Sequence, residues 1–248
     1  MARRQASCSR SQMIREFVLL SARAFQSRRG LTWSMGARSR WETGSAMGGY
    51  VYARVIVEGV TDKPVITELM RAAGWSDTQF NVTAVNGKGA IDTRIQKYWE
   101  AARIVPYVIF RDVDCDEGSC PVAVRSALSS KMPGESDGLL IRIVDQCIES
   151  WVLADQQGIA EFCAVSPASV KIPGSHHKAY LLRMFQEARL NNAVERVGRE
   201  LDFGPAYELH LQNLMTHYWA AERAAIQSES LRRALTRLAE LRERLADK

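Results

Sequence analysis

The chain has 248 residues, of which 46% are hydrophobic and 25% charged, and its formal net charge is +5. This composition is typical of a globular protein whose core needs no covalent staples, and the length suits one or two domains. It excludes a collagen-like repeat, a wholly disordered chain and a small disulfide-stabilised protein. The longest apolar runs, such as 17–20 and 105–110, fall far short of the roughly 18 residues that span a bilayer, so a membrane protein is excluded too.

The positive charge is concentrated at the N-terminus. Nine arginines, no lysine and two glutamates give residues 1–46 a net charge of +7, which leaves 24 basic and 26 acidic side chains in residues 47–248. We expect residues 1–46 to be a disordered Arg/Ser-rich arm, or translated sequence upstream of a true start at Met47. A transit peptide is the alternative, because such peptides are also rich in Arg and Ser. The basic isoelectric point therefore gives no support for nucleic-acid binding by the folded part.

The cysteines indicate a reducing compartment. Five are present, at positions 8, 115, 120, 147 and 163, and no CxxC pair occurs. An odd number without paired spacing favours reduced thiols in the cytoplasm over a disulfide framework. No Cys/His quartet has the spacing of a zinc site.

From residue 50 on, strand-like and helical patterns alternate. Apolar runs predict strands and amphipathic runs predict helices, in the order strand 50–59, helix 61–75, strand 81–89 with its glycine turn, helix 90–104, strand 105–114, helix 121–130, strand 138–145 and helix 146–165. Because the strands are apolar throughout, we predict a parallel sheet covered by helices on both faces.

The rest of the chain reads as a loop followed by helix. Residues 166–178 are rich in Pro, Gly and Ser, which predicts a loop, and residues 178–248 are predicted to be wholly helical. Leucines at 231, 235, 238, 241 and 245 repeat at spacings of four and three. A helix packed on the core and a homodimer seam both explain this repeat. We therefore expect a catalytic domain over 47–165 and a loop with a helical part over 166–248.

Acidic residues follow three of the predicted strands. Glu58 ends the first strand, with Asp62 four residues later; Asp112 and Asp114 end the third; and Glu149 lies one helical turn after the fourth. Ligands of an open parallel sheet bind at the carboxyl ends of its strands. If these strands are neighbours, the five carboxylates converge, and such a group needs a cation to stay ionised. Oxygen ligands favour Mg²⁺, Mn²⁺ or Ca²⁺. Taken singly, each acid is also explained as a helix N-cap or a surface loop residue.

The order and spacing of these motifs resemble a family. VIVEGVTD, followed about 50 residues later by IFRDVDCD, is similar to a Toprim domain, whose signature is a glutamate after the first strand and a DxD after a later one. Glu58 matches the glutamate, and Asp112 and Asp114 match the DxD. Asp62, the NGKG turn and the segment IESWVLAD look more like the nucleases of the OLD (overcoming lysogenization defect) family and small standalone bacterial Toprim proteins. The resemblance covers residues 51–160, with a weaker match as far as Lys178.

The resemblance implies a fold and an activity. The fold is α/β: a Toprim-like, Rossmann-like parallel sheet flanked by helices, with a helical C-terminal extension and the disordered N-terminal arm. The activity is Mg²⁺- or Mn²⁺-dependent hydrolysis of DNA, in phage or plasmid defence or in DNA repair. Two alternatives to a DNA nuclease remain open. An RNA-processing enzyme of the maturase type shares the motifs, and a non-catalytic metal-binding or interaction module would also contain these acids. OLD proteins join the nuclease to an ATPase, but this chain has no GxxxxGK[ST] motif, so any ATPase would be a separate partner.

Two smaller motifs are candidates for binding phosphate. Asn86, Gly87, Lys88 and Gly89 lie between a strand and a helix, where backbone N–H groups and a lysine are able to hold a phosphate; a plain turn explains them equally well. Lys178, which follows His176 and His177 in the Gly/Pro loop, is placed to stabilise a scissile phosphate, and a solvated helix start is its other interpretation.

Overall fold

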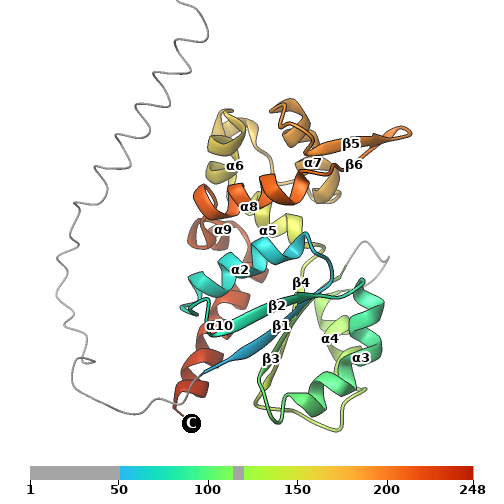
Figure 1. Cartoon of the computed structure of the whole chain (residues 1–248), viewed down its shortest axis with the longest axis vertical. Helices are drawn as coiled ribbons and strands as arrows, with labels where there is room; N and C mark the ends of the chain where they lie inside the picture. Colours follow the sequence, from blue (N-terminus) through green and yellow to red (C-terminus); the bar gives the residue numbers. More distant parts are fainter. Residues whose placement is uncertain (1–50, 114–119, 248) are drawn as a thin grey trace, which may run out of the picture. The chain divides into compact units, whose positions relative to one another are not determined.

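The sheet at the centre of the fold is parallel and has four strands. The computed structural model describes residues 51–113 and 120–247, so the N-terminal arm, Asp114 and Cys115 lie outside the described residues. The strands are β1 (Ala53–Val57), β2 (Phe80–Ala84), β3 (Tyr107–Asp112) and β4 (Leu139–Val144), in the spatial order β2-β1-β3-β4 (Figure 1). All three neighbouring pairs are parallel. The predicted α/β class and strand positions are confirmed.

Helices cover both faces of this sheet. Neighbouring residues of a strand point to opposite faces, and in β1 Val55 and Val57 belong to one hydrophobic cluster while Ile56 belongs to the other. The smaller cluster lies under α3 (Lys88–Ala101) and α4 (Pro121–Ser129), which flank one side of the sheet in Figure 1. The larger cluster includes side chains of α2 (Asp62–Ala72), α5 (Ile148–Ala154) and the C-terminal helices. The two central strands, β1 and β3, are buried on both faces as predicted, whereas Asn81 and Thr83 of the edge strand β2 are exposed.

The predicted helix over 146–165 is interrupted by a buried acid. It forms two helices, α5 and α6 (Gln156–Cys163), with Asp155 between them at φ −91° and ψ 75°. The Asp155 carboxylate, 1% exposed, accepts hydrogen bonds from the backbone N–H groups of Gly158 (3.2 Å) and Ala220 (2.7 Å). It also accepts two from the guanidinium of Arg223, at 2.8 and 2.7 Å. The break thus caps α6 and ties it to the C-terminal helices.

The prediction of continuous helix over 178–248 is wrong between 188 and 206. After the short 3-10 helix η2 (Pro167–Ser169) and α7 (His177–Glu187), the chain forms an antiparallel hairpin of β5 (Val194–Val197) and β6 (Glu200–Phe203). Only the second half of this segment, residues 200–203, alternates charged and apolar residues with the period of a strand, whereas Val194 and Val197 are three residues apart. Gly198 adopts the positive φ of 64° that a tight turn needs. The helices resume with α8 (Tyr207–His217), α9 (Ala221–Gln227) and α10 (Glu229–Ala246).

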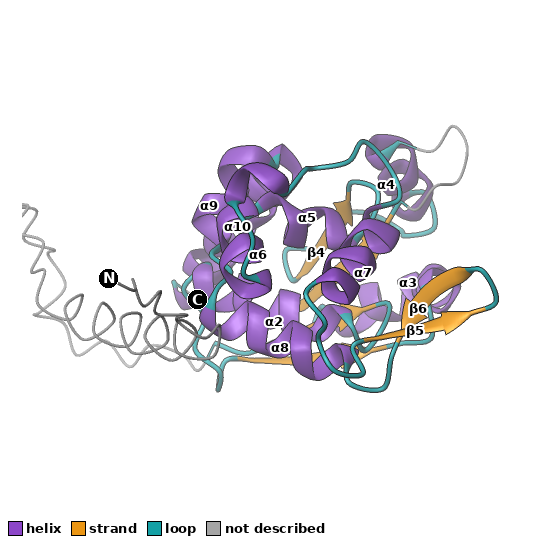
Figure 2. Cartoon of the chain, turned by 90° about the horizontal axis from the view of Figure 1, so that it is seen from above, coloured by secondary structure: helices purple, strands orange, loops and turns teal. Residues whose placement is uncertain are grey.

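The leucine repeat of α10 packs inside this chain. Leu231, Leu238 and Leu241 are at most 1% exposed, and Leu235 and Leu245 pack against the same cluster. This cluster also contains Val51 and Val55, so the last helix shares one core with the first strand. Figure 2 shows α8, α9 and α10 beside α2 and α5. The repeat is therefore explained by core packing. Within the described residues, no helix is both long and apolar enough to cross a membrane.

We predict that Asp155 is a main anchor of the C-terminal helices. Asp155→Asn removes the charge from a buried ion pair and leaves its donors incompletely satisfied, which we expect to lower the free energy of unfolding by on the order of 3 kcal/mol. The matched control is Asp77→Asn, because Asp77 forms an ion pair with Arg71 at 2.7 Å while its side chain is 65% exposed. That change is expected to leave the free energy of unfolding nearly unchanged, because water screens an exposed ion pair. Urea unfolding followed by circular dichroism measures both, and equal losses would refute the anchor.

Candidate functional site

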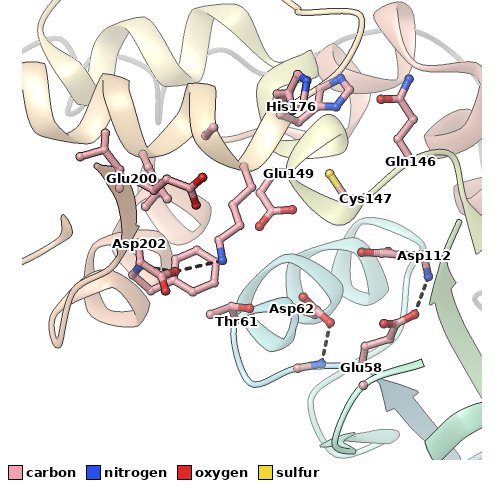
Figure 3. Close-up of a pocket in the computed structure, with 18 of the residues that line it drawn as sticks. Glu58, Thr61, Asp62, Asp112, Gln146, Cys147, Glu149, His176, Glu200 and Asp202 are labelled. Carbon is pink, nitrogen blue, oxygen red and sulfur yellow. Dashed lines mark hydrogen bonds and ion pairs between the residues drawn. The ribbon is translucent and has the colours of Figure 1, made fainter. Parts of the chain in front are cut away.

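A pocket of about 720 Å³ opens at the carboxyl end of the sheet. Six carboxylates line it, and four of them belong to the edge of the sheet and to α2 and α5: Glu58, Asp62, Asp112 and Glu149. Figure 3 shows them on the same side of the pocket, with Glu200 and Asp202 of the hairpin on the other. The structure therefore brings together four of the five acids that the sequence singles out; the fifth, Asp114, lies outside the described residues. Asp145, which directly follows β4, does not line the pocket.

Parallel pairing explains why these four acids meet. Glu58 follows β1 and Asp112 ends β3, and these two strands are neighbours in the sheet. Asp62 is the first residue of α2, and Glu149 lies in the first turn of α5. α2 follows β1 and α5 follows β4, and these two strands run in the same direction. The first turns of both helices therefore lie at the same edge of the sheet.

Backbone amides hold three of the carboxylates. The N–H of Asp112 donates to Glu58 Oε1 at 2.8 Å, and that of Gly59 donates to Asp62 Oδ2, also at 2.8 Å. The N–H of Ile148, the first residue of α5, donates to Asp112 Oδ2 at 3.3 Å. Asp62 does not act as the N-cap of α2, since that position is taken by Thr61. Asp112, by contrast, lies at the end of β3 and accepts a hydrogen bond from the first N–H of α5. The interpretation of these acids as helix caps therefore applies in part to Asp112.

The carboxylates raise one another's pKa. Burial raises the pKa of Asp62 to about 6, and the charge of Glu149 adds to this while the hydrogen bond from Gly59 opposes it. Burial also raises the pKa of Asp112 well above its usual range, and the charges of Asp62, Glu58 and Glu149 raise it further. Glu149 is itself only 7% exposed. The site thus concentrates negative charge where water screens it poorly.

The arginine next to Asp112 does not relieve this charge. Successive residues of a strand point to opposite faces of the sheet. The Arg111 guanidinium donates to both carboxylate oxygens of Asp92 in α3, at 3.2 and 3.0 Å. It also donates to the backbone carbonyl of Asp112. Arg111 therefore anchors the end of β3 to α3 on the face away from the larger cluster.

The donor set suits a hard divalent cation. Carboxylate oxygens from four separate segments are the ligands that Mg²⁺ and Mn²⁺ prefer. Among the described residues, however, no three His, Cys, Asp or Glu side chains already stand in a metal-binding arrangement. Holding a cation would therefore require rotation of these side chains. Asp114 follows Asp112 by two residues in the sequence.

Lys178 lies on the hairpin side of the pocket. It is in the first turn of α7, and its Nζ donates to Asp202 Oδ1 at 3.1 Å and lies 3.7 Å from the centre of the Phe203 ring. His176 and His177 line the pocket beside it. Burial lowers the pKa of His177, which favours its neutral form. The lysine is thus in the pocket, but an ion pair with the hairpin holds it.

Of the four residues proposed as a phosphate cradle, Gly87 lines the pocket, whereas Asn86, Lys88 and Gly89 do not. Gly87 has a positive φ of 77° and is the N-cap of α3. Its N–H already donates to the carbonyls of Glu58 at 3.1 Å and Val85 at 2.8 Å. This amide therefore closes the turn after β2, and the cradle stays a prediction.

Sequence reasoning missed the wall opposite the carboxylates. The hairpin contributes Val197, Glu200, Leu201, Asp202 and Phe203, and the segment before α5 contributes Gln146 and Cys147. Burial, together with the charges of Glu149 and Asp112, raises the pKa of Cys147, so its thiol stays protonated. The alternation of charged and apolar residues over 200–203, directly after Gly198, was the available signal for the hairpin.

We predict that the metal-free protein loses stability as pH rises from about 4 to above 6. The folded-state pKa of Asp62, about 6, exceeds its ordinary value of 3.8, so the folded state binds more protons than the unfolded state in this range. Asp62→Asn removes that titration. The difference in unfolding free energy between Asp62→Asn and wild type should therefore grow in favour of the variant from pH 4 to pH 7. Urea unfolding in EDTA at several pH values measures it, and a constant difference would contradict the raised pKa.

Comparison with known proteins finds neither a family model nor a curated protein that matches the chain. Solved structures do match. The C-terminal region of the Burkholderia pseudomallei OLD protein is 16% identical with a TM-score of 0.39, and the match covers 80% of this chain and 98% of that one. Two structures of the C-terminal region of the Xanthomonas campestris pv. campestris OLD protein are 13% identical, with TM-scores of 0.43 and 0.40, and cover 79% and 80% of this chain and 95% and 97% of theirs. The chain is thus similar in structure to C-terminal regions of OLD proteins and spans nearly the whole length of each.

Proposed function

We propose that this chain is a metal-dependent nuclease that hydrolyses phosphodiester bonds of DNA, with Mg²⁺ or Mn²⁺ held in the carboxylate pocket. One observation carries the proposal: Glu58, Asp62, Asp112 and Glu149 converge at the carboxyl edge of a parallel sheet. Burial and the charges of the other three acids raise the pKa of Asp112. A pocket that gathers four carboxylates at one edge is suited to a cation. The Toprim-like order of the motifs in the sequence supports the same interpretation.

Each carboxylate has a role in this proposal. Glu58 and Asp62 would hold the metal centre on one side and Asp112 and Asp114 on the other, with Glu149 bridging or completing the coordination shell. Divalent cations in such a centre supply an activated water and stabilise the leaving oxygen. The backbone hydrogen bonds to Glu58, Asp62 and Asp112 keep these side chains at the edge of the pocket in the metal-free protein.

Lys178 has a role on the substrate side. Its ammonium group is on the wall opposite the carboxylates and would neutralise the charge of the scissile phosphate. Asp202 holds the lysine there by an ion pair. A phosphodiester lying between the hairpin and the sheet would have the carboxylates on one side and this ammonium group on the other.

The substrate, setting and partners follow from the resemblance alone. DNA is proposed ahead of RNA, and phage or plasmid defence or DNA repair in the cytoplasm is the proposed setting. A separate ATPase and a homodimer remain proposals. An RNA-processing enzyme would have the same pocket, so substrate assays must include both nucleic acids.

We predict that Asp112→Asn and Glu58→Gln abolish metal-dependent cleavage. Both changes keep the shape and an oxygen acceptor while removing the charge. Asp145→Asn is the matched control, because Asp145 also follows a strand but lies outside the pocket. The assay incubates purified protein with plasmid DNA or RNA in Mg²⁺, Mn²⁺ or EDTA. Cleavage that persists in EDTA, or in both pocket variants, would refute the proposal.

Thermal melting separates metal binding from capping. We expect millimolar Mn²⁺ or Mg²⁺ to raise the melting temperature of wild type, as any ligand of the native state does, and not that of Asp112→Asn. Without metal, the same variant should melt no lower than wild type, since it removes a repelled charge while the Asn carbonyl still accepts from Ile148. If Asp112 served only to cap α5, neutralising it should cost about 0.5–2 kcal/mol instead. If neither metal changes the melting temperature of wild type, the proposed metal site is refuted and only the fold assignment stands.

A further inference from the structure

A second concave site lies along β4, toward the other end of the strands. This groove of about 700 Å³ is lined by the first residues of β4, by the loop before it and by side chains of α4 and α10. Trp99, near the end of α3, also lines it. β4 is an edge strand of the sheet. Four arginines face the groove: Arg125, Arg142, Arg237 and Arg244.

Arg142 is the unusual member of this group. It lies in β4, and its Nε is buried without a hydrogen-bond partner among the described residues. Burial, together with repulsion from Arg125, Arg237 and Arg233, lowers the pKa of Arg142 to about 10. A crowded, poorly solvated guanidinium is costly unless an anion accompanies it.

The protein itself supplies little compensation at this point. Arg237 pairs with Glu240 at 2.7 Å, and Arg233 pairs with Glu229 at 2.7 Å. Arg125 and Arg244 donate to backbone carbonyls, those of Ile141 at 3.4 Å and Asp137 at 3.0 Å. Within the described part of the chain, no carboxylate forms an ion pair with Arg125, Arg142 or Arg244. Glu135 and Asp137 also line the groove, but they belong to the loop before β4.

We propose that this groove binds phosphate groups of a nucleic-acid strand, with Arg142 and Arg125 as the phosphate ligands. The inference rests on the proposed function and adds a second contact to it, away from the carboxylate pocket. Residues 47–248 carry two more acidic than basic side chains, so any affinity for nucleic acid must come from a local cluster such as this one.

Two features favour nucleic acid over an acidic peptide. The planar guanidinium fork matches the geometry of phosphate oxygens. Trp99 lines the same groove, and its ring is fixed by a hydrogen bond from Nε1 to the carbonyl of Gly134 at 2.8 Å. A held indole ring beside arginines is suited to stack on a base while the arginines hold the backbone.

The test measures binding without cleavage. The full chain carrying Asp112→Asn, in EDTA, is titrated against a fluorescent single-stranded oligonucleotide at several salt concentrations. Added Arg142→Met should weaken binding about tenfold, the effect of losing one charged hydrogen-bonding partner, and reduce the salt slope by about one. Arg94→Met, an exposed position of α3 outside the groove, is the matched control. The arginine-rich residues 1–46 are the same in every variant, so they cancel in the comparison.

The variant should keep its fold. Because neighbouring arginines repel Arg142 and its buried Nε has no hydrogen-bond partner within the described chain, Arg142→Met should melt no lower than its parent, whereas an arginine needed for structure would lower the melting point when removed. Arg125→Gln, on the exposed surface of α4, is a second variant and should weaken binding in the same direction.

Several outcomes would overturn the inference. Equal affinities for Arg142→Met, Arg125→Gln and Arg94→Met would do so, as would displacement of the oligonucleotide by polyglutamate from parent and Arg142→Met alike. A parallel cleavage assay of wild type with Mn²⁺ separates the two proposals. If wild type cleaves DNA but Arg142→Met does not weaken oligonucleotide binding, only the proposal for the groove is refuted. If binding depends on Arg142 but wild type cleaves nothing, the groove is supported and the proposed nuclease activity is refuted.

Discussion

The direction of the strands is the constraint on which the candidate site depends. β1 and β3 run parallel as neighbours, so the residues that follow them arrive at one edge whatever lies between them in the sequence. The hydrogen bond from the Asp112 N–H to Glu58 then extends the pairing of these strands into their acidic ends. A single antiparallel reversal would send one of these two acids to the opposite end of the sheet. The same constraint places the first turns of α2 and α5, with Asp62 and Glu149, at that edge.

Charge is divided between two regions of the molecule. The carboxyl edge of the sheet collects acids from four segments, and the side of β4 collects arginines from α4, β4 and α10. In both regions like charges crowd together with poor access to water, which is visible in the raised pKa of Asp112 and the lowered pKa of Arg142. Folding against such repulsion is uphill, and the apolar core between the two regions, with residues such as Val108, Trp151 and Leu231, must offset it.

The sheet and its acids were predictable because their signals are local. Apolar runs ending in polar residues fix the strands, and Glu58, Asp62 and Asp112 stand at fixed distances from them. The hairpin over 194–203 was missed because its helical neighbours dominate the composition, and only its second strand, over 200–203, alternates charged and apolar residues. Asp155 was missed for another reason: an aspartate within a helical pattern looks neutral until the tertiary structure brings Ala220 and Arg223 to it. The groove along β4 likewise joins residues more than 100 positions apart, which no local pattern reveals.

The buried Asp155 has a consequence for how this chain is built up from parts. It stands directly after α5, the helix that carries Glu149, and its carboxylate is clamped by the start of α9. The position of one pocket acid is therefore set by residues that follow it by some 70 positions. A chain shortened at residue 165 would keep every Toprim-like motif and yet lose the support that orients Glu149. The segment needed to form this site is consequently longer than its motifs. A chimaera that replaces the C-terminal helices must also supply residues that hold α5 in place.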